Sequence, residues 1–244
     1  MSSRDKDDPV RIEVDYDVDL IALHAGMPDS YPFLLESVAT GTPRSRFDIL
    51  FAFPEEELVL GADGALRRAG SKLGSGDFLS ALDAWWASSD PRAAPVDASV
   101  PFSGGWFVYL GYELAGQIEP TVGFGEAEQP WPVATAVRIP VAVVRDHVAR
   151  RACVIAEPGY LDGAQALAAD CRAAKPGFPE AQMLGESSGE VLAEEDPDRF
   201  LDGVARVKSY IRDGDVFQVN LSRGWRGRLK DDVDETTIYR RLRL

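Results

Sequence analysis

Residues that could act in catalysis are few in this sequence and lie far apart. The chain has two histidines, His24 and His147, and two cysteines, Cys153 and Cys171. His24 lies in an apolar stretch without a second histidine, so we interpret it as a packed residue. The two cysteines do not have the spacing of metal ligands, and Cys171 has no base near it in the chain, so we expect a small buried side chain. None of these residues is assigned as a base, nucleophile or metal ligand.

Two further motifs could bind ligands. Gly104 and Gly105 precede a dense apolar run, but the lysine and hydroxyl residue of a phosphate-binding loop are missing, and no dinucleotide fingerprint fits. We therefore expect a strand whose ends approach other backbone closely. The adjacent Trp85 and Trp86 could form a stacking platform, but core packing is the favoured interpretation because they continue the apolar face of a predicted helix.

The composition indicates a globular protein. The 244 residues are 45% hydrophobic and 9% aromatic, and the formal net charge is −14. This charge argues against a nucleic-acid partner, which would require clustered Lys and Arg. The apolar run from Trp106 to Leu110 is far too short to span a membrane, and the N-terminus has no apolar core of a signal peptide. We therefore expect a cytoplasmic protein with neither a nucleic-acid nor a membrane partner.

Hydrophobic periodicity predicts a mixture of strands and helices. Asp63 and Gly64 predict a tight hairpin turn, and His147 is expected at the exposed tip of a second hairpin, so the sheet should be antiparallel. Strands are expected at 11–16, 31–38, 45–53, on both sides of the Asp63-Gly64 turn, directly after Gly105, and at 140–145 and 152–156. Helices are expected at 19–25, from 77 onwards, and at 161–174.

The segment 196–222 predicts a helix, a tight turn and a strand. Asp196 is a good N-cap, Pro197 suits the first helical turn, and Gly214 can end the helix in the left-handed conformation. Beyond it, apolar and polar residues alternate over 217–222, which predicts a strand.

The chain is expected to divide into four parts. Residues 1–10 form a disordered arm, 11–174 a first domain, and 175–195 a linker rich in Pro, Gly, Ser and acidic residues. Residues 196–244 begin a second domain, which we expect to be incomplete because a predicted helix is cut off at the last residue.

Three stretches, in this order and spacing, carry a family resemblance. They are LLES at 34–37 followed by SRFDI at 45–49, PFSGGWFVYLGYELAG at 101–116, and YIRDGDVFQVNLSRGW at 210–225. The sequence resembles the N-terminal half of aminodeoxychorismate synthase component I, in the family that includes anthranilate synthase component I. SRFDI and Asn220 resemble the aminodeoxychorismate branch, whereas the anthranilate branch tends to show RYSF. LLES is shared by both branches.

The resemblance implies an α+β fold, a truncated antiparallel β-sandwich with flanking helices. It also implies amination of chorismate to 4-amino-4-deoxychorismate, in folate and p-aminobenzoate biosynthesis, with ammonia from a glutaminase subunit. Magnesium is expected as the cofactor of the full-length enzyme, where it acts as a Lewis acid. In the family its ligands lie in the C-terminal half, which this chain lacks. The 244 residues alone are therefore expected to be inactive.

The resemblance also implies a pocket of the size of tryptophan near the LLES strand. By position it consists of Glu36, Ser37, Arg44, Ser45, Arg46 and Phe47. A hydroxyl group and loop amides would suit a zwitterion, and Phe47 would suit an indole. These residues could equally close a loop without binding a ligand.

Two alternative functions remain open. The chain could belong to an anthranilate synthase component I, in tryptophan biosynthesis, or it could be a noncatalytic module that binds an amino acid or the glutaminase. A sandwich with missing strands would expose apolar faces and sheet edges, so we also expect poor solubility or association.

Overall fold

The computed structural model of this chain describes residues 10–37, 45–74, 76–89, 100–121, 131–174, 189–231 and 233–243. The chain divides into two compact units, Met1–Gly177 and Phe178–Leu244, which are described separately. The division falls inside the segment 175–195 that was expected to link two domains. The arm at 1–10 lies outside the described residues except for Val10. The domain assignment stays a prediction.

The described part of the first unit contains two five-stranded sheets, and every strand pairing in them is antiparallel. Sheet A has the order β1 (Val10–Val14), β10 (Arg151–Ala156), β9 (Val141–Asp146), β3 (Phe47–Ala52) and β2 (Phe33–Leu35). Sheet B has the order β6 (Ser71–Gly74), β5 (Leu66–Arg68), β4 (Glu57–Leu60), β8 (Ala134–Ile139) and β7 (Gly105–Leu110). Strand β8 leads into β9 through Pro140, so the chain passes directly from sheet B to sheet A.

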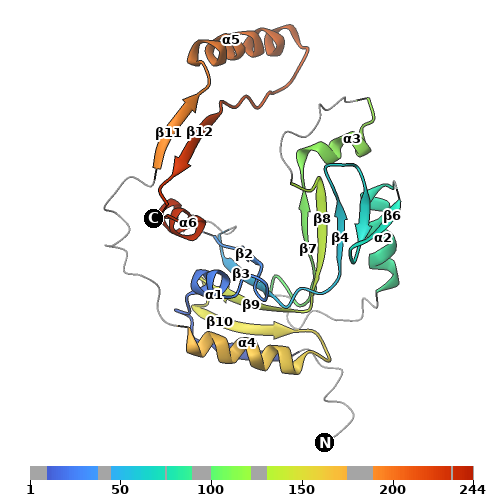
Figure 1. The fold of residues 1–244 in the computed structure, drawn as a ribbon, viewed down its shortest axis with the longest axis vertical. Coiled ribbons are helices and arrows are strands. Elements are labelled where there is room, and N and C mark those ends of the chain that lie inside the picture. Colours follow the sequence, from blue (N-terminus) through green and yellow to red (C-terminus); the bar gives the residue numbers. More distant parts are fainter. Residues whose placement is uncertain are drawn as a thin grey trace, which may run out of the picture. The chain divides into compact units, whose positions relative to one another are not determined.

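The two sheets pack face to face and are covered by helices on their outer faces. Figure 1 shows their strands crossing, with α4 (Leu161–Ala173) along the outer face of sheet A. Between the sheets, Phe33 stacks on Phe107 with ring centroids 3.9 Å apart. On the outer face of sheet A, buried residues of β3, β9 and β10 pack against α4 and against α1 (Leu20–Gly26). This arrangement confirms the expected antiparallel β-sandwich with flanking helices.

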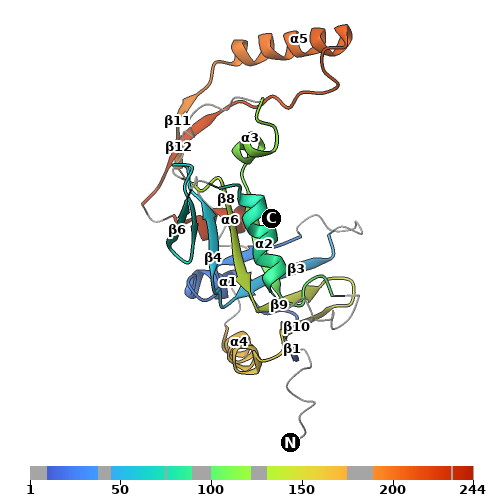
Figure 2. The same cartoon turned by 90° about the vertical axis from the view of Figure 1, so that its right-hand side faces the viewer.

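Helix α2 (Phe78–Ser88) covers the outer face of sheet B (Figure 2). Asp77 caps it by accepting hydrogen bonds from the backbone N–H groups of Leu79 and Ser80. Trp85 is buried, as core packing required, whereas Trp86 is 55% exposed, so the core interpretation is right for only one of the pair. After β7 the chain forms the short helices η1 (Tyr112–Leu114) and α3 (Ala115–Ile118).

The second unit pairs β11 (Gly189–Glu194) with β12 (Trp225–Leu229) and also contains α5 (Pro197–Asp213) and α6 (Glu235–Leu242). Asp196 caps α5 and Gly214 ends it with φ +82°, as predicted. One other prediction for this region is wrong, because residues 217–222 form no strand. Residues 189–194, which lie in the expected linker, form strand β11. The side chain of Leu221 instead lies against Gly203 of α5. The ladder of this unit forms between β11 and β12, and the alternation of apolar and polar residues along one segment does not specify which segment it pairs with.

Candidate functional site

The last residues before the gap at 38–44 lie beside the beginning of β3. The β2–β3 ladder ends at the pair Leu35 and Ile49. Beyond it, the Ser37 backbone N–H donates to Oδ1 of Asp48 at 2.8 Å, and the Ser37 hydroxyl donates to the carbonyl oxygen of Phe47 at 3.0 Å. Side-chain hydrogen bonds therefore continue the contact between the two strands where the ladder stops.

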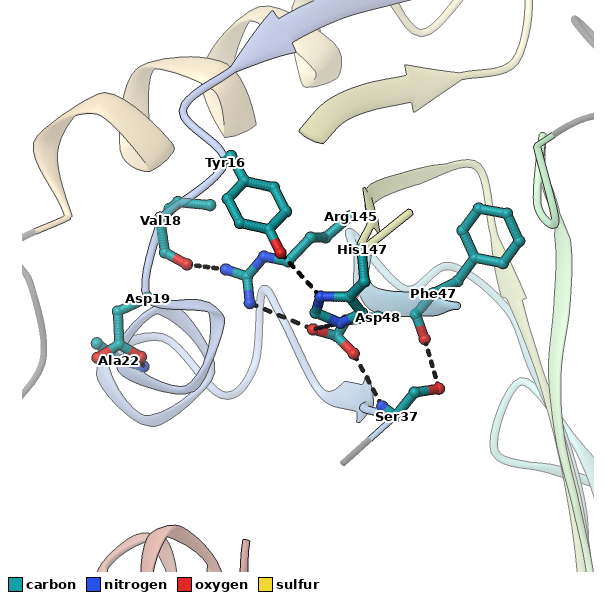
Figure 3. Close-up of polar contacts among 9 residues, drawn as sticks. All are labelled: Tyr16, Val18, Asp19, Ala22, Ser37, Phe47, Asp48, Arg145 and His147. Atoms are coloured by element: carbon teal, nitrogen blue, oxygen red, sulfur yellow. Dashed lines mark hydrogen bonds and ion pairs between the residues drawn. The ribbon is translucent and has the colours of Figure 1, made fainter. Parts of the chain in front are cut away.

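The Asp48 carboxylate is the centre of a buried polar cluster, which Figure 3 shows. Asp48 is 2% exposed, and its Oδ2 accepts a hydrogen bond from Nη1 of Arg145 at 3.2 Å. Nε2 of His147 lies 2.9 Å from the same oxygen. A buried carboxylate is tolerated only when it is paired and hydrogen-bonded, so these contacts explain how the charge is accommodated on the face of sheet A that carries the helices.

The cluster extends to the segment between β1 and α1. The Tyr16 hydroxyl lies 3.0 Å from Nδ1 of His147, and Nη2 of Arg145 donates to the carbonyl oxygen of Val18. Nε2 of His147 is close to Asp48 but does not have the geometry of a hydrogen bond to it. We will call Tyr16, Asp48, Arg145 and His147 the Asp48 cluster.

A second ion pair lies at the same end of sheet A. Arg46 donates from Nε to Oδ1 of Asp146 at 3.1 Å and from Nη2 to Oδ2 at 2.7 Å. The guanidinium lowers the pKa of Asp146 to about 2. Burial of the carboxyl group opposes this shift in part, and hydrogen bonds from backbone N–H groups of the following turn add to it. The Arg46 guanidinium also lies over the Phe47 ring, 4.7 Å from its centroid.

The described residues of the expected tryptophan pocket have different surroundings. Ser37 faces Asp48, whereas the Phe47 ring packs into the core between the sheets with Val100, Phe102 and Val144. The cavity beside Phe47 has a volume of about 10 Å³, which is room for no more than a water molecule. Arg46 is engaged by Asp146, Glu36 and Ser45 are half-buried, and Arg44 lies outside the described residues.

Sequence reasoning missed the Asp48 cluster. His147 is in a turn, as predicted, but it is not an exposed tip residue, because Tyr16 and Asp48 hold its ring. A signal was present in the sequence: Asp48 and Arg145 are charged residues inside apolar strands, and a charge at a core position needs a partner. His24 is a packed residue, as expected, with its Nδ1 2.7 Å from the carbonyl oxygen of Tyr31.

A concave surface of the first unit lies between α2 and β7. Its volume is about 410 Å³, and its lining is mostly apolar and includes the exposed Trp86 and Val108 together with Asp83. Within the ranges that the structure describes, no three His, Cys, Asp or Glu side chains converge as metal ligands would. None of the described helices is long and apolar enough to cross a bilayer.

Comparison with known proteins finds similar sequences that share one name. Anthranilate synthase component 1 of Cereibacter sphaeroides is 28% identical over 230 residues, covering 86% of this chain and 45% of that protein. The protein of the same name from Synechocystis is 30% identical over 239 residues, covering 88% and 46%. The chain thus spans about half the length of these relatives.

A solved structure agrees in fold. Anthranilate synthase component I from Streptococcus pneumoniae superposes with a TM-score of 0.59 at 21% identity, covering 84% of this chain and 46% of that chain. The sequence profile described as chorismate binding enzyme matches residues 33–244, which is most of this chain. On this evidence the chain belongs to the chorismate-binding enzyme family.

Proposed function

We propose that this chain is part of component I of aminodeoxychorismate synthase, the enzyme that aminates chorismate to 4-amino-4-deoxychorismate. Family membership supports the substrate, and SRFDI together with Asn220 supports the branch. The observation that carries the choice is the position of Asp48. The aspartate of SRFDI stands where the RYSF pattern of the anthranilate branch has serine, and here it is the buried centre of a polar cluster.

The reaction requires groups that we place outside the described residues of this chain. We propose that ammonia comes from a glutaminase subunit and that magnesium is held in the part of the complete enzyme that follows in the longer relatives. The two-sheet unit would then act as a scaffold, since its buried charges are used in internal pairs. The chain alone should not consume chorismate above background when it is supplied with ammonium and magnesium ions.

A product assay tests this proposal, and it uses the complete protein that contains this sequence. Chorismate, ammonium and magnesium ions are supplied, and the products are separated by chromatography. We expect 4-amino-4-deoxychorismate. Consumption of chorismate without this product would contradict the proposed branch, and no consumption by the complete protein would contradict the enzyme class.

Anthranilate synthesis is the second candidate. The observation in its favour is that the relatives compared above carry the name anthranilate synthase component 1, and LLES is common to both branches. The same assay discriminates between the two, because anthranilate would appear as a fluorescent product. Inhibition of the complete enzyme by tryptophan would also favour this candidate.

We further propose an amino-acid pocket at the strand end formed by Glu36 and Ser37. Its support is positional: the carboxylate of Glu36 and the hydroxyl oxygen of Ser37 lie together at the end of β2, so a charged ammonium group could find acceptors there. Calorimetric titration with tryptophan at millimolar concentration tests it. The absence of any binding heat would contradict the pocket without affecting the chemistry proposed for the enzyme.

A further inference from the structure

We propose that the concave surface between α2 and β7, which we call the α2–β7 groove, binds an extended peptide that adds to sheet B as an antiparallel strand beside β7. The peptide that fits has alternating apolar side chains and a lysine or arginine among them. Its binding would not involve the amination of chorismate. Three features of the first unit point to it: a free strand edge, an apolar groove along that edge, and a carboxylate in the groove.

Strand β7 has a free edge. It is the terminal strand of sheet B, and its described partner is β8 (Figure 1). The Gly111 N–H continues this ladder by donating to the Val133 carbonyl oxygen at 2.8 Å. Because the direction of hydrogen bonding alternates along a strand, the backbone groups of Trp106, Val108 and Leu110 point away from β8. Within the described ranges nothing pairs with these outward groups, so they can accept an added strand.

The groove lies on the face of β7 that α2 covers. Alternate residues of β7 and one side of α2 form its lining, which consists of Trp106, Val108, Leu79, Leu82, Asp83 and Trp86. The α2 residues are three or four positions apart and therefore share a side of the helix. The volume of about 410 Å³ can hold side chains of a ligand. Val108 and Trp86 are 42% and 55% exposed, so an added strand would cover apolar surface.

The floor of the groove is held in place by packing. The Trp106 ring lies edge to face with the buried Trp85, with ring centroids 5.6 Å apart. The guanidinium of Arg138 lies over the Trp106 ring, 4.8 Å from its centroid, and pairs with Glu157. A wall that is already ordered lowers the entropy cost of binding.

The free edge and the groove suit the same ligand. In an antiparallel pairing, the residues that hydrogen-bond to Trp106, Val108 and Leu110 place their side chains on the same face as these residues, which is the groove side. The described strand pairings of sheet B are all antiparallel, so an added antiparallel strand continues the pattern. One set of peptide residues would therefore make both the backbone hydrogen bonds and the apolar contacts, as in peptide recognition by sheet extension.

Asp83 determines the charge of the ligand. It is exposed, and it is the charged member of a lining that is otherwise made of Leu, Trp and Val. A lysine or arginine among the groove-facing residues of the peptide would complement it. A second copy of β7 would not supply this charge, because Gly105–Leu110 contains no Lys or Arg. The formal net charge of −14 also disfavours an acidic peptide.

Fluorescence anisotropy with labelled, end-capped peptides tests the proposal on the whole chain, at concentrations where sedimentation shows a monomer. The probe alternates valine with threonine, and its central valine is replaced by lysine. We expect this peptide to bind, and glutamate in place of the lysine to weaken binding by about tenfold. Methylation of the valine and lysine backbone nitrogens, which would face β7, should abolish binding. Methylation of the threonine nitrogens, which would face away, should leave it unchanged.

Variants of the groove locate the bound peptide. We expect Asp83→Asn to weaken binding of the lysine peptide by about threefold and Trp86→Ala to weaken it by about tenfold. Both side chains are exposed, so both variants should fold. Asp162→Asn and Leu161→Ala are the matched controls, because they change an exposed carboxylate and an exposed apolar side chain on α4. They should bind the peptide as the unchanged chain does.

Three results would overturn the proposal. The first is an equal effect of the two methylations, which would show that the peptide does not pair with the edge of β7. The second is equal affinity for the lysine and glutamate peptides, or no effect of Trp86→Ala, which would place the peptide outside the groove. The third is a chain that binds neither peptide at millimolar concentration, whether or not a second copy occupies the edge.

Discussion

Arg46 and Asp146 lie 100 residues apart in the sequence and form a bidentate ion pair, with Nη2 and Oδ2 separated by 2.7 Å. The pair joins the residue before β3 to the last residue of β9. Asp146 also accepts hydrogen bonds from the backbone N–H groups of Val148 and Ala149 in the turn. One carboxylate thus fixes both the beginning of β3 and the turn that presents His147 to Asp48.

Acid should weaken the fold through this pair. The folded-state pKa of Asp146 is lowered from 3.8 to about 2, so its contribution is complete above the unfolded pKa and disappears as the pH falls from about 4 towards 2. Because Arg46 is partly exposed, we expect Arg46→Gln to lower the unfolding free energy at pH 6 by only about 1 kcal/mol. Denaturant unfolding from pH 7 to pH 2 should show this difference vanishing, whereas a constant difference would contradict it. Arg199→Gln, on the exposed side of α5, is the control.

Gly104 should not tolerate a side chain. It has φ +112°, and a Cβ atom there would clash with the carboxylate of Glu157, which pairs with Arg138. We expect Gly104→Ala to cost about 3 kcal/mol in unfolding free energy, since it combines backbone strain with displacement of a buried ion pair.

Gly64 is the matched control for this substitution. It also has a positive φ, +71°, but a Cβ atom there would meet nothing within 4 Å. Gly64→Ala should therefore cost only about 1 kcal/mol. Equal losses for the two variants in urea unfolding would show that the Glu157 contact is unimportant.

The two thiols should be unreactive in the folded chain. Cys153 and Cys171 are buried, and burial raises the pKa of both, that of Cys171 to about 12 with a further contribution from Asp170. Because the thiolate is the reactive form, a chromogenic disulfide reagent at pH 8 should titrate fewer than one thiol per folded chain. The same reagent in denaturing urea should titrate both. Rapid reaction without denaturant would contradict the burial of these groups.

The outer edge of β7 should promote association. Val108 and Leu110 are 42% and 51% exposed on this terminal strand of sheet B, and Gly105–Leu110 contains no charged residue and no proline to block edge pairing. We expect light scattering to show association as concentration rises, and Val108→Lys to raise the concentration required by about tenfold. Leu161→Lys, an equally exposed apolar position on helix α4, should have no such effect. A chain that remains monomeric at all concentrations would contradict the prediction.

Much of the fold was predictable because its signals are local. The helices expected to begin near Asp19, Asp77 and Asp196 do so, with these residues as their N-caps, and Asp63-Gly64 forms its hairpin turn, with φ +71° at Gly64. A cap or a tight turn involves residues only a few positions apart, so the sequence specifies it directly. The error at 217–222 has the complementary cause, since alternation indicates which side chains share a face but does not say whether another strand is available to pair.

By itself the sequence determined the family resemblance, the sandwich class and the residues that lie at the LLES strand end. Only the tertiary structure decided how those residues are used: Phe47 enters the core, Arg46 is bound by Asp146, and Ser37 is anchored on Asp48. The physical reason is that buried charges choose partners by proximity in space. Asp48 finds its partners on β9 and the turn after it, about 100 residues away, and no local pattern in the sequence encodes that meeting.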